Sequence, residues 1–263
     1  MVMNYNCRNL RESKYFLSTE HKPKEMARLF CFPYGGGNAS IYREWNRLLP
    51  PQIGVYPIQL PGRGARISEN LPTNLSSIID ELVEAILPLS DLPYFFFGHS
   101  MGALLSFELC RRLRTHETTP VHLFVSGYRA PHLEDSEPHL HTLPDHEFLQ
   151  EIINMNGTPT ETISDKSFVE FFLPILRSDF RICELYRYIE EVPLDIPITA
   201  FGGNKDPDVS PDDLKEWKIH TTNRFNYFML DGDHFFLHQQ QSRLVNMISL
   251  IGIEEMKRFT MKR

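Results

Sequence analysis

The sequence predicts an α/β fold, in which a mostly parallel sheet is covered by helices on both faces and a helical insertion comes late in the chain. Two observations lead to this prediction. Short apolar runs alternate with segments whose apolar residues recur at helical spacing, and such alternation is typical of parallel sheets. From about Ala130 to Val192 the alternation stops and only helical patterns remain. A chain of 263 residues can bury such a core without disulfides or metals.

Six apolar runs are expected to be buried strands. Most are rich in Phe, Val, Ile and Leu and are closed by glycine or proline, as buried parallel strands commonly are. The runs cover residues 27–33, 54–60, 94–100, 121–127, 197–203 and 225–230.

Helices are expected between these runs. In residues 74–87 the apolar side chains follow one helical stripe, which Pro88 ends. Residues 101–114 and 236–250 carry the same kind of pattern.

The insertion, at about residues 130–190, is predicted to be a mobile helical lid or a substrate-binding subdomain, because long irregular insertions are usually functional. Residues 145–157 and 167–189 are predicted to be amphipathic helices, and Pro174 should kink the second or divide it. The apolar residues of these helices are expected to line a substrate site, with packing onto the sheet as the alternative. They are Phe148, Ile152, Phe171, Phe172, Leu173 and Leu176.

Composition and charge argue against several classes of protein. The formal net charge of −7 argues against a general nucleic-acid binder, because phosphate binding depends on Lys and Arg. No apolar run approaches the roughly 20 residues that span a bilayer, and residues 1–16 lack the apolar core of a secretory signal. The cysteines have no metal-ligand spacing, so free thiols in the cytoplasm are expected. They are Cys7, Cys31, Cys110 and Cys183.

A serine between two glycines stands where a predicted strand meets a predicted helix. The stretch Gly98-His99-Ser100-Met101-Gly102 has the pattern G-x-S-x-G. In a sharp strand-to-helix turn, side chains at the two glycine positions would collide with the neighbouring strand and helix, while the serine hydroxyl is exposed. The start of the helix would direct N–H groups toward a developing oxyanion. The sequence therefore predicts that Ser100 is a nucleophile, rather than part of an ordinary turn.

A serine nucleophile requires a base and a group that orients the base. His234 follows the last predicted strand and is the best placed histidine, whereas His238, one helical turn later, is expected to face solvent. Asp206 follows the preceding strand, and Asp208 is kept as the alternative carboxylate. The predicted triad has the chain order serine, acid, histidine.

The other histidines are expected to be structural. His99 should pack or cap beside the nucleophile. His132, His139, His141 and His146 fall in one polar stretch whose spacing matches no standard metal site. A solvated loop is therefore expected there, and no metal site is predicted.

The glycine-rich stretch "FPYGGGN", residues 32–38, follows the first predicted strand. It lacks the GK[ST] and GxGxxG spacings of phosphate-binding loops. Because glycines let backbone N–H groups approach a carbonyl oxygen closely, the stretch fits an oxyanion hole. The expected donors are the backbone N–H groups of Tyr34 and Met101, and a flexible turn is the alternative.

These stretches together resemble the type II thioesterases of nonribosomal peptide and polyketide synthesis. The resemblance runs from Arg28 to about Ile251 and rests on "FCFPYGGGNASIYREW", "QLPGRGAR", "FFFGHSMGALLSFEL", "LPILRSDF" and "LDGDHFFL". It implies an α/β-hydrolase fold with a helical lid, related to the medium-chain thioesterases of fatty-acid synthesis. The domain is placed at residues 26–258, and residues 1–25 are expected to form an extension that can be disordered.

The resemblance also implies a function and roles for the candidate residues. Ser100 would be the nucleophile, His234 the base and Asp206 its orienter, with Tyr34 and Met101 as the oxyanion hole. The enzyme would remove stalled or mis-loaded acyl groups from the phosphopantetheine arm of carrier domains, without a metal or diffusible cofactor. Carrier domains are the expected partners of a cytoplasmic monomer that binds neither nucleic acid nor membrane.

Two alternatives in function stay open at this point. A medium-chain acyl-carrier thioesterase, an oxygen-ester hydrolase or an acyltransferase would use the same triad, and a hydrolase-fold protein without catalysis would only bind. Arg63 and Arg66, in "PGRGAR", also carry two hypotheses. They would either meet the phosphate of phosphopantetheine or tie loops to carboxylates.

Overall fold

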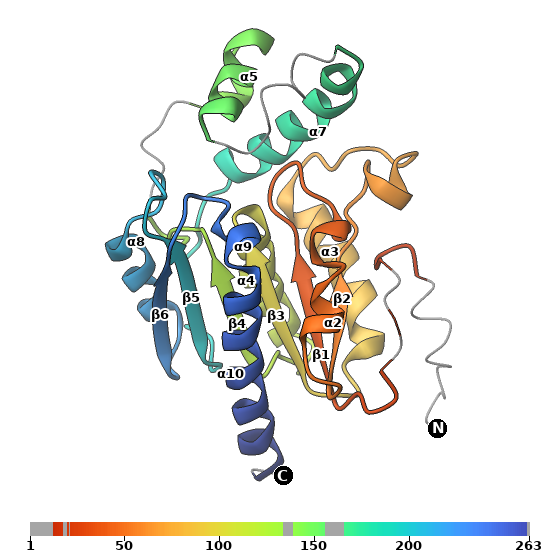
Figure 1. Cartoon of the computed structure of the whole chain (residues 1–263), viewed down its shortest axis with the longest axis vertical. Helices are drawn as coiled ribbons and strands as arrows, with labels where there is room; N and C mark the ends of the chain where they lie inside the picture. Colours follow the sequence, from red (N-terminus) through yellow and green to blue (C-terminus); the bar gives the residue numbers. More distant parts are fainter. Residues whose placement is uncertain (1–12, 18–19, 21, 134–138, 156–165, 262–263) are drawn as a thin grey trace.

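A parallel sheet of six strands, in the order β2-β1-β3-β4-β5-β6, forms the centre of the molecule (Figure 1). The computed structural model describes residues 13–17, 20, 22–133, 139–155 and 166–261. The predicted fold class is confirmed, and each predicted strand is present. The strands are β1 (Ala27–Phe32), β2 (Ile53–Pro57), β3 (Tyr94–His99), β4 (His122–Ser126), β5 (Ile198–Gly203) and β6 (Phe225–Leu230).

Side chains of the central strands alternate between two buried clusters. Phe30 and Phe96 lie in the cluster that α3 (Leu75–Ile86) and α4 (Met101–Arg114) complete. Leu29 and Phe97 lie in the cluster that α10 (Gln241–Met261) completes. Successive strand residues point to opposite faces, so helices cover both faces of the sheet. This explains why the strands read as continuous apolar runs.

The helices beside the sheet agree with the predictions except near the C-terminus. α4 spans the predicted residues, and α3 begins after Asn74, whose side chain accepts the Ser77 N–H at 2.9 Å. The predicted single helix at 236–250 is wrong. The backbone leaves helical geometry at Gln240, so two helices form, α9 (Phe236–Gln239) and α10. Short elements that were not predicted are η1 (Ala39–Tyr42), α2 (Trp45–Leu48), η2 (Gly64–Arg66), η3 (Leu87–Leu89), η4 (Leu140–Thr142), α8 (Pro211–Lys215) and η5 (Glu216–His220).

The insertion between β4 and β5 contains two helices, α5 (Asp145–Asn154) and α7 (Lys166–Glu184). They stand over the carboxyl ends of the strands (Figure 1). Both helices end earlier than predicted, and α7 continues through Pro174 as one helix. The proposed limits of the lid include residues 134–138 and 156–165, which lie outside the described residues.

The apolar side chains of the lid have different surroundings. Phe148 and Ile152 of α5 are buried, and the Phe148 ring packs on Phe180 of α7 with ring centroids 5.4 Å apart. Phe171 of α7 is 47% exposed. Phe148 therefore joins α5 to α7, and the role of these helices as a lid that lines a substrate site stays a prediction.

Part of the predicted N-terminal extension packs on the domain, which corrects the expectation for those residues. Phe16 forms an antiparallel bridge with Ile58 and is 7% exposed. The Leu17 N–H donates to the Pro57 carbonyl oxygen at 3.0 Å. Lys22 Nζ donates to the carbonyl oxygens of residues 49, 50 and 53 at 2.9, 3.0 and 2.9 Å. The Phe16 ring also packs on Phe30 of β1, with ring centroids 5.8 Å apart, so the described part of this segment is tied to β1, to β2 and to the residues that flank β2. Residues 1–12, 18–19 and 21 lie outside the described residues.

The described cysteines are free thiols. Cys31 and Cys110 are fully buried, and burial raises the pKa of both thiols well above its usual value. A thiol with a raised pKa is a poor nucleophile. Cys183 is partly buried, and Cys7 lies outside the described residues. Among the described helices, none has the length and apolar character to cross a membrane.

His122, at the start of β4, is a buried histidine that stays neutral in the folded protein. It is 2% exposed, and its ring stacks on Phe124 with centroids 4.3 Å apart. Nε2 lies 2.9 Å from Thr199 Oγ1, whereas Nδ1 has no partner among the described residues. Burial lowers the pKa of His122 to about 3, with the charge of Arg224 as a lesser cause.

We expect this histidine to weaken the fold in acid. In an unfolded chain histidine has a pKa of about 6.5, so between pH 6.5 and 3 the unfolded state binds a proton that the folded state does not. The free energy of unfolding should therefore fall as the pH is lowered from 7 to 4. The free energy of unfolding of His122→Leu should fall less over the same pH range, as measured by urea denaturation at each pH. The exposed His146 serves as control, and equal slopes for His122→Leu and wild type would contradict the prediction.

Candidate active site

In the turn around Ser100, positions 98 and 102 have room for no residue larger than glycine. Ser100 connects β3 to α4 with φ 52° and ψ −121°, a conformation that few non-glycine residues adopt. A Cβ on Gly98 would lie 2.0 Å from the Gly102 carbonyl oxygen. A Cβ on Gly102 would lie 2.2 Å from the Phe32 carbonyl oxygen. The predicted strand–turn–helix context is therefore present, with the strained backbone that functional residues often carry.

Two backbone N–H groups come together beside this turn. β1 and β3 are neighbours, with Phe32 opposite Gly98 in the ladder, so the residues that follow them share one end of the sheet. Gly102 lies against the backbone of residues 32–33. Within the part of the chain that the structure describes, the N–H groups of Tyr34 and Met101 have no hydrogen-bond acceptor. Both are available to an oxygen atom of a ligand.

The loops after β5 and β6 bring a histidine and a carboxylate together. His234 Nδ1 lies 2.9 Å from Asp206 Oδ2, and the side chains are 14% and 0% exposed. The other oxygen, Asp206 Oδ1, accepts the Asp208 N–H at 3.0 Å. An oxygen of Asp208 also lies within 4.8 Å of the ligand atoms of both partners. The hydrogen bond to the imidazole is nevertheless made by Asp206.

His99 packs beside the turn, as expected, and also holds the histidine loop. The ring is fully buried, with Nε2 2.9 Å from the His234 carbonyl oxygen and Nδ1 2.8 Å from Ser126 Oγ. Burial lowers the pKa of His99 well below its usual value, so the ring is neutral. A carbonyl oxygen only accepts, so Nε2 carries the hydrogen and Nδ1 accepts from Ser126. The sequence placed His99 next to Ser100 but had no signal for this contact with His234.

The glycine loop after β1 is a closed turn packed against α7. The Gly37 N–H donates to the Tyr34 carbonyl oxygen at 2.9 Å, and Gly36 has φ 76°. The positive φ of Gly36 favours glycine, and a Cβ there would also lie 2.5 Å from Leu176 Cδ2, which would have to move. The Gly36 N–H donates to Asp179 Oδ2 at 2.7 Å.

The side chain of Tyr34 joins this loop to α9. Its hydroxyl lies 3.0 Å from Nε2 of His238, and its ring packs edge-on against Phe235 with centroids 5.1 Å apart. His238 is exposed, as the sequence suggested, but it is bonded rather than free. Tyr34 is thereby held through its carbonyl oxygen by Gly37 and through its side chain by His238 and Phe235.

Arg63 and Arg66 are buried ion-pair residues. Arg63 is 3% exposed and pairs with Asp179, while Arg66 is 2% exposed and pairs with Glu69 and Glu81. The hypothesis that they meet a phosphate is wrong, because their guanidinium groups are out of solvent and already bound to carboxylates. The alternative, that they tie loops to carboxylates, is confirmed.

Two of the four histidines expected in a solvated loop make hydrogen bonds through a ring nitrogen to other described side chains. His132 Nδ1 lies 2.9 Å from His220 Nε2, and its side chain is 22% exposed. His146, with a side chain 82% exposed, is solvated as expected. His141 hydrogen bonds through Nδ1 to the Glu184 carboxylate.

Glu184 explains the arrangement around His141. Its carboxylate accepts the N–H groups of Leu140 at 2.9 Å and His141 at 3.1 Å, which begin η4 and have no partner within it. A nitrogen of His139 lies within 4.8 Å of the ligand atoms of these two side chains. The carboxylate already has these donors, so its evident role is to hold η4 against α7. The expectation of a solvated loop is therefore wrong for His132 and His141.

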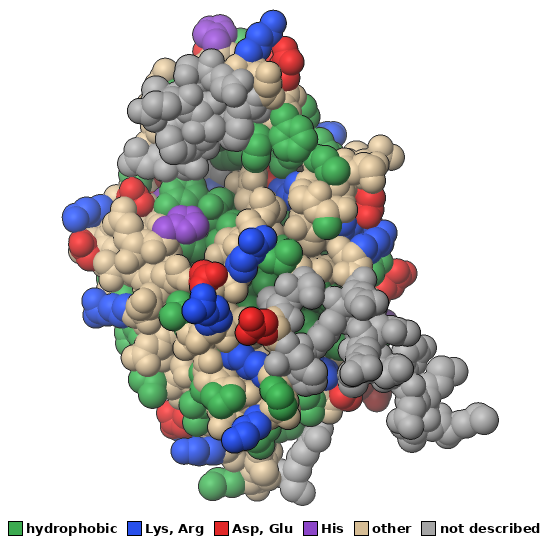
Figure 2. Space-filling model, turned by 45° about the vertical axis from the view of Figure 1, so that its right-hand side comes forward, with side chains coloured by type: hydrophobic (Ala, Val, Ile, Leu, Met, Phe, Trp, Pro, Cys, Tyr) green, Lys and Arg blue, Asp and Glu red, His purple; other side chains and the backbone are tan. Residues whose placement is uncertain are grey.

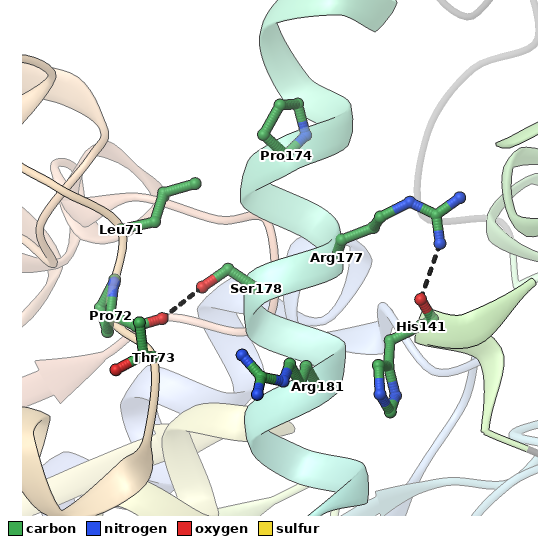
Figure 3. Close-up of a pocket in the computed structure, with 8 residues that line it drawn as sticks. All are labelled: Leu71, Pro72, Thr73, His141, Pro174, Arg177, Ser178 and Arg181. Atoms are coloured by element: carbon green, nitrogen blue, oxygen red, sulfur yellow. Dashed lines mark hydrogen bonds between the residues drawn. The ribbon is translucent and has the colours of Figure 1, made fainter.

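A cavity of about 320 Å³ lies beside α7, and its lining includes the loop at residues 71–73 as well as Arg177 and His141 (Figure 3). Ser178 Oγ donates to the Pro72 carbonyl oxygen at 2.7 Å, and Arg177 donates to the His141 carbonyl oxygen at 2.8 Å. Neither the Ser100 turn nor the His234–Asp206 pair lines this cavity. Its lining consists of Leu71, Pro72, Thr73, His141, Pro174, Arg177, Ser178 and Arg181.

Comparisons with known proteins agree with the geometry of the site. The linear gramicidin dehydrogenase LgrE of Brevibacillus parabrevis is 48% identical over 240 residues, which are 90% of this chain and 91% of that protein. The gramicidin S biosynthesis protein GrsT of Aneurinibacillus migulanus is 42% identical over 90% of this chain and 93% of its own.

A solved structure is similar as well. RedJ, a thioesterase from the prodiginine biosynthetic pathway of Streptomyces coelicolor, superposes with a TM-score of 0.81 at 37% identity. The similarity covers 86% of this chain and 85% of RedJ. The thioesterase domain family matches residues 27–251. The chain therefore belongs to the thioesterase domain family.

Proposed function

We propose that this chain is a discrete type II thioesterase that removes acyl groups from the phosphopantetheine arm of carrier domains. Its relatives take part in gramicidin S and prodiginine biosynthesis, which supports a role in nonribosomal peptide or polyketide synthesis. The observation that carries the proposal is the hydrogen bond of His234 to Asp206 at the same end of the sheet as the strained Ser100 turn. This set of groups suits acyl transfer through a serine.

The proposed reaction has two steps. Ser100 Oγ attacks the thioester carbonyl carbon while His234 Nε2 takes its proton, and the C–S bond then breaks as the thiol receives that proton. A water molecule, deprotonated by His234, then attacks the acyl carbon; the bond to Ser100 Oγ breaks as His234 returns the proton to that oxygen, and the acid is released. Asp206 holds the hydrogen on Nδ1, so that Nε2 is free to act as base.

The proposed oxyanion hole consists of the two N–H groups without acceptors. The Met101 N–H stands at the start of α4, where the helix dipole favours negative charge. The Tyr34 N–H comes from the closed glycine turn. Donors that are held before the reaction begins stabilise the tetrahedral intermediate without a cost of reorganisation.

The name of LgrE raises the alternative of a dehydrogenase. Hydride transfer from a nicotinamide requires a pyrophosphate site, usually G-x-G-x-x-G after the first strand. Here the stretch after β1 reads Gly35-Gly36-Gly37, and α7 covers it at Leu176. The residues of this loop therefore favour an oxyanion hole over a dinucleotide site.

Recognition of the carrier domain is expected to use local contacts. The chain has a net charge of −7, and acidic and basic side chains are interspersed on the face in Figure 2, so no single-sign patch on that face would attract an acidic partner over long range. Hydrophobic side chains appear at the upper end of this face, where the lid helices stand. Phe171, 47% exposed on α7, is the contact that we select for testing.

We expect one acyl group to be hydrolysed more efficiently on a carrier domain than on coenzyme A or pantetheine, by about tenfold or more in kcat/KM, equivalent to about 1.4 kcal/mol of binding. Phe171→Ser should reduce this advantage. Ile219→Ser, which alters an exposed apolar residue of η5, is the control. Equal kcat/KM values for the three substrates would leave the editing role without its main support.

A matched pair of substrates tests the alternative of an oxygen-ester hydrolase or acyltransferase. A pantetheine thioester and its oxygen-ester analogue present the same acyl chain, and preference for the thioester is expected.

Serine-based hydrolysis of a thioester uses only water as co-substrate, so no cofactor is proposed. The monomeric state and the cytoplasmic location stay predictions.

A further inference from the structure

One buried ion pair joins the lid helix α7 to the loop after β2. Asp179 of α7 accepts hydrogen bonds from both ends of the Arg63 guanidinium, at 2.5 Å from Nη1 and 2.7 Å from Nη2. The side chains of Asp179 and Arg63 are 1% and 3% exposed. Such a two-pronged contact fixes direction as well as distance.

The same ion pair holds the backbone of the glycine loop. Asp179 Oδ2 accepts the Gly36 N–H at 2.7 Å, and Arg63 Nη1 donates to the Gly37 carbonyl oxygen at 3.3 Å. The Gly37 N–H in turn closes the turn on the Tyr34 carbonyl oxygen at 2.9 Å. A rotated peptide plane in this turn would break one of these bonds, so the pair fixes the segment that begins at Tyr34.

Stability alone gives little reason for this pair. Removing a carboxylate and a guanidinium from water is costly, and apolar side chains of similar size often serve the fold equally well. The contacts of Asp179 and Arg63 with two successive glycine peptides instead suggest a geometric role.

We propose that Asp179 and Arg63 are positioning residues for the oxyanion hole, acting through Gly36 and Gly37 on the Tyr34 N–H. The inference rests on the proposed role of Tyr34. It makes α7 part of the catalytic apparatus, because the donor is in place only while Asp179 sits on the glycine loop. Loss of one oxyanion-hole donor costs about 10²–10³-fold in kcat, which sets the upper limit for a misplaced one.

The double variant Arg63→Met/Asp179→Leu removes the pair without leaving a buried charge unpaired. With acyl-pantetheine as substrate, kcat should fall by about 10²-fold, while KM and the melting temperature change little. Arg66→Met is the matched control, because Arg66 is equally buried in the same loop but pairs with Glu69 and Glu81. Its kcat should stay near that of the wild type.

Two inhibitors separate positioning from general damage to the loop. In a trifluoromethyl ketone analogue of acyl-pantetheine, the carbonyl carbon is attacked by Ser100 Oγ, whose proton passes to His234. The resulting hemiketal places its oxyanion in the oxyanion hole. A thioether analogue of the same length cannot form this hemiketal. The double variant should bind the ketone more weakly by the factor lost in kcat and bind the thioether as the wild type does.

Several outcomes would overturn the inference. An unchanged kcat in the double variant would do so, as would equal weakening of both inhibitors or the same loss in Arg66→Met. If the double variant melts at a lower temperature, Arg63→Lys keeps the charge without the two-pronged contact and must show the same selective loss for the ketone. A wild-type protein that fails to hydrolyse the thioester would instead refute the proposed function.

Discussion

Replacing Ser100 with alanine is expected to lower kcat for thioester hydrolysis by about 10⁴- to 10⁶-fold, because members of a triad act as a unit. Serine and alanine both carry a Cβ, so the positive φ of 52° should cost about the same conformational free energy with either residue. The fold should therefore persist in the variant. Hydrolysis of acyl-pantetheine measures the loss.

A covalent intermediate gives the sharper test of Ser100. Intact-mass spectra of the wild type during turnover should show an acyl adduct, and a fluorophosphonate should label the same residue. Both signals should vanish in Ser100→Ala. Ser106→Ala removes a buried hydroxyl within α4, which donates to the Ala103 carbonyl oxygen at 2.9 Å, and should keep both. An adduct that persists in Ser100→Ala would show that the nucleophile is elsewhere.

Asp206→Asn should be nearly as damaging, with kcat reduced by about 10⁴-fold. The carboxylate accepts the hydrogen of His234 Nδ1, and an asparagine that turned its N–H₂ toward the ring would favour the tautomer with the hydrogen on Nε2. That tautomer cannot take the serine proton.

Asp208→Asn is the control for this substitution. Its carboxylate is exposed, and its backbone N–H, which the change preserves, is the group bonded to Asp206. Activity close to that of the wild type is expected, with both variants checked by their melting temperature. A crippled Asp208→Asn beside a normal Asp206→Asn would reverse the assignment of the acid.

Much of the fold could be predicted because its signals are local. A strand buried on both faces is a continuous apolar run, and a turn such as that at Ser100 needs glycine on each side. Loops that follow parallel strands lie at the same end of the sheet. Asp206 and His234 follow two successive strands, so the sequence could predict that they meet.

The remaining contacts depend on residues far apart in the chain. Arg63 meets Asp179 across 116 positions, and His99 meets the His234 carbonyl across 135. No pattern in a single sequence marks such partners. The sequence therefore left two hypotheses for the partner of Arg63 and predicted no role for Asp179. The break at Gln240 was missed for a different reason, since the apolar spacing continues through it while the backbone does not.

The packing of the N-terminal segment on β2 has a consequence for self-association. β2 is an outer strand, and the unpaired backbone groups of such a strand offer a template for a second chain. Here the Ile53 carbonyl is taken by Lys22, the Val55 N–H by Asn46 at 3.3 Å and the Pro57 carbonyl by Leu17. Successive outward-facing groups of β2 are thus occupied by the chain itself. The segment before β1, together with Asn46 of α2, therefore leaves fewer free backbone groups on this edge strand to pair with a second chain.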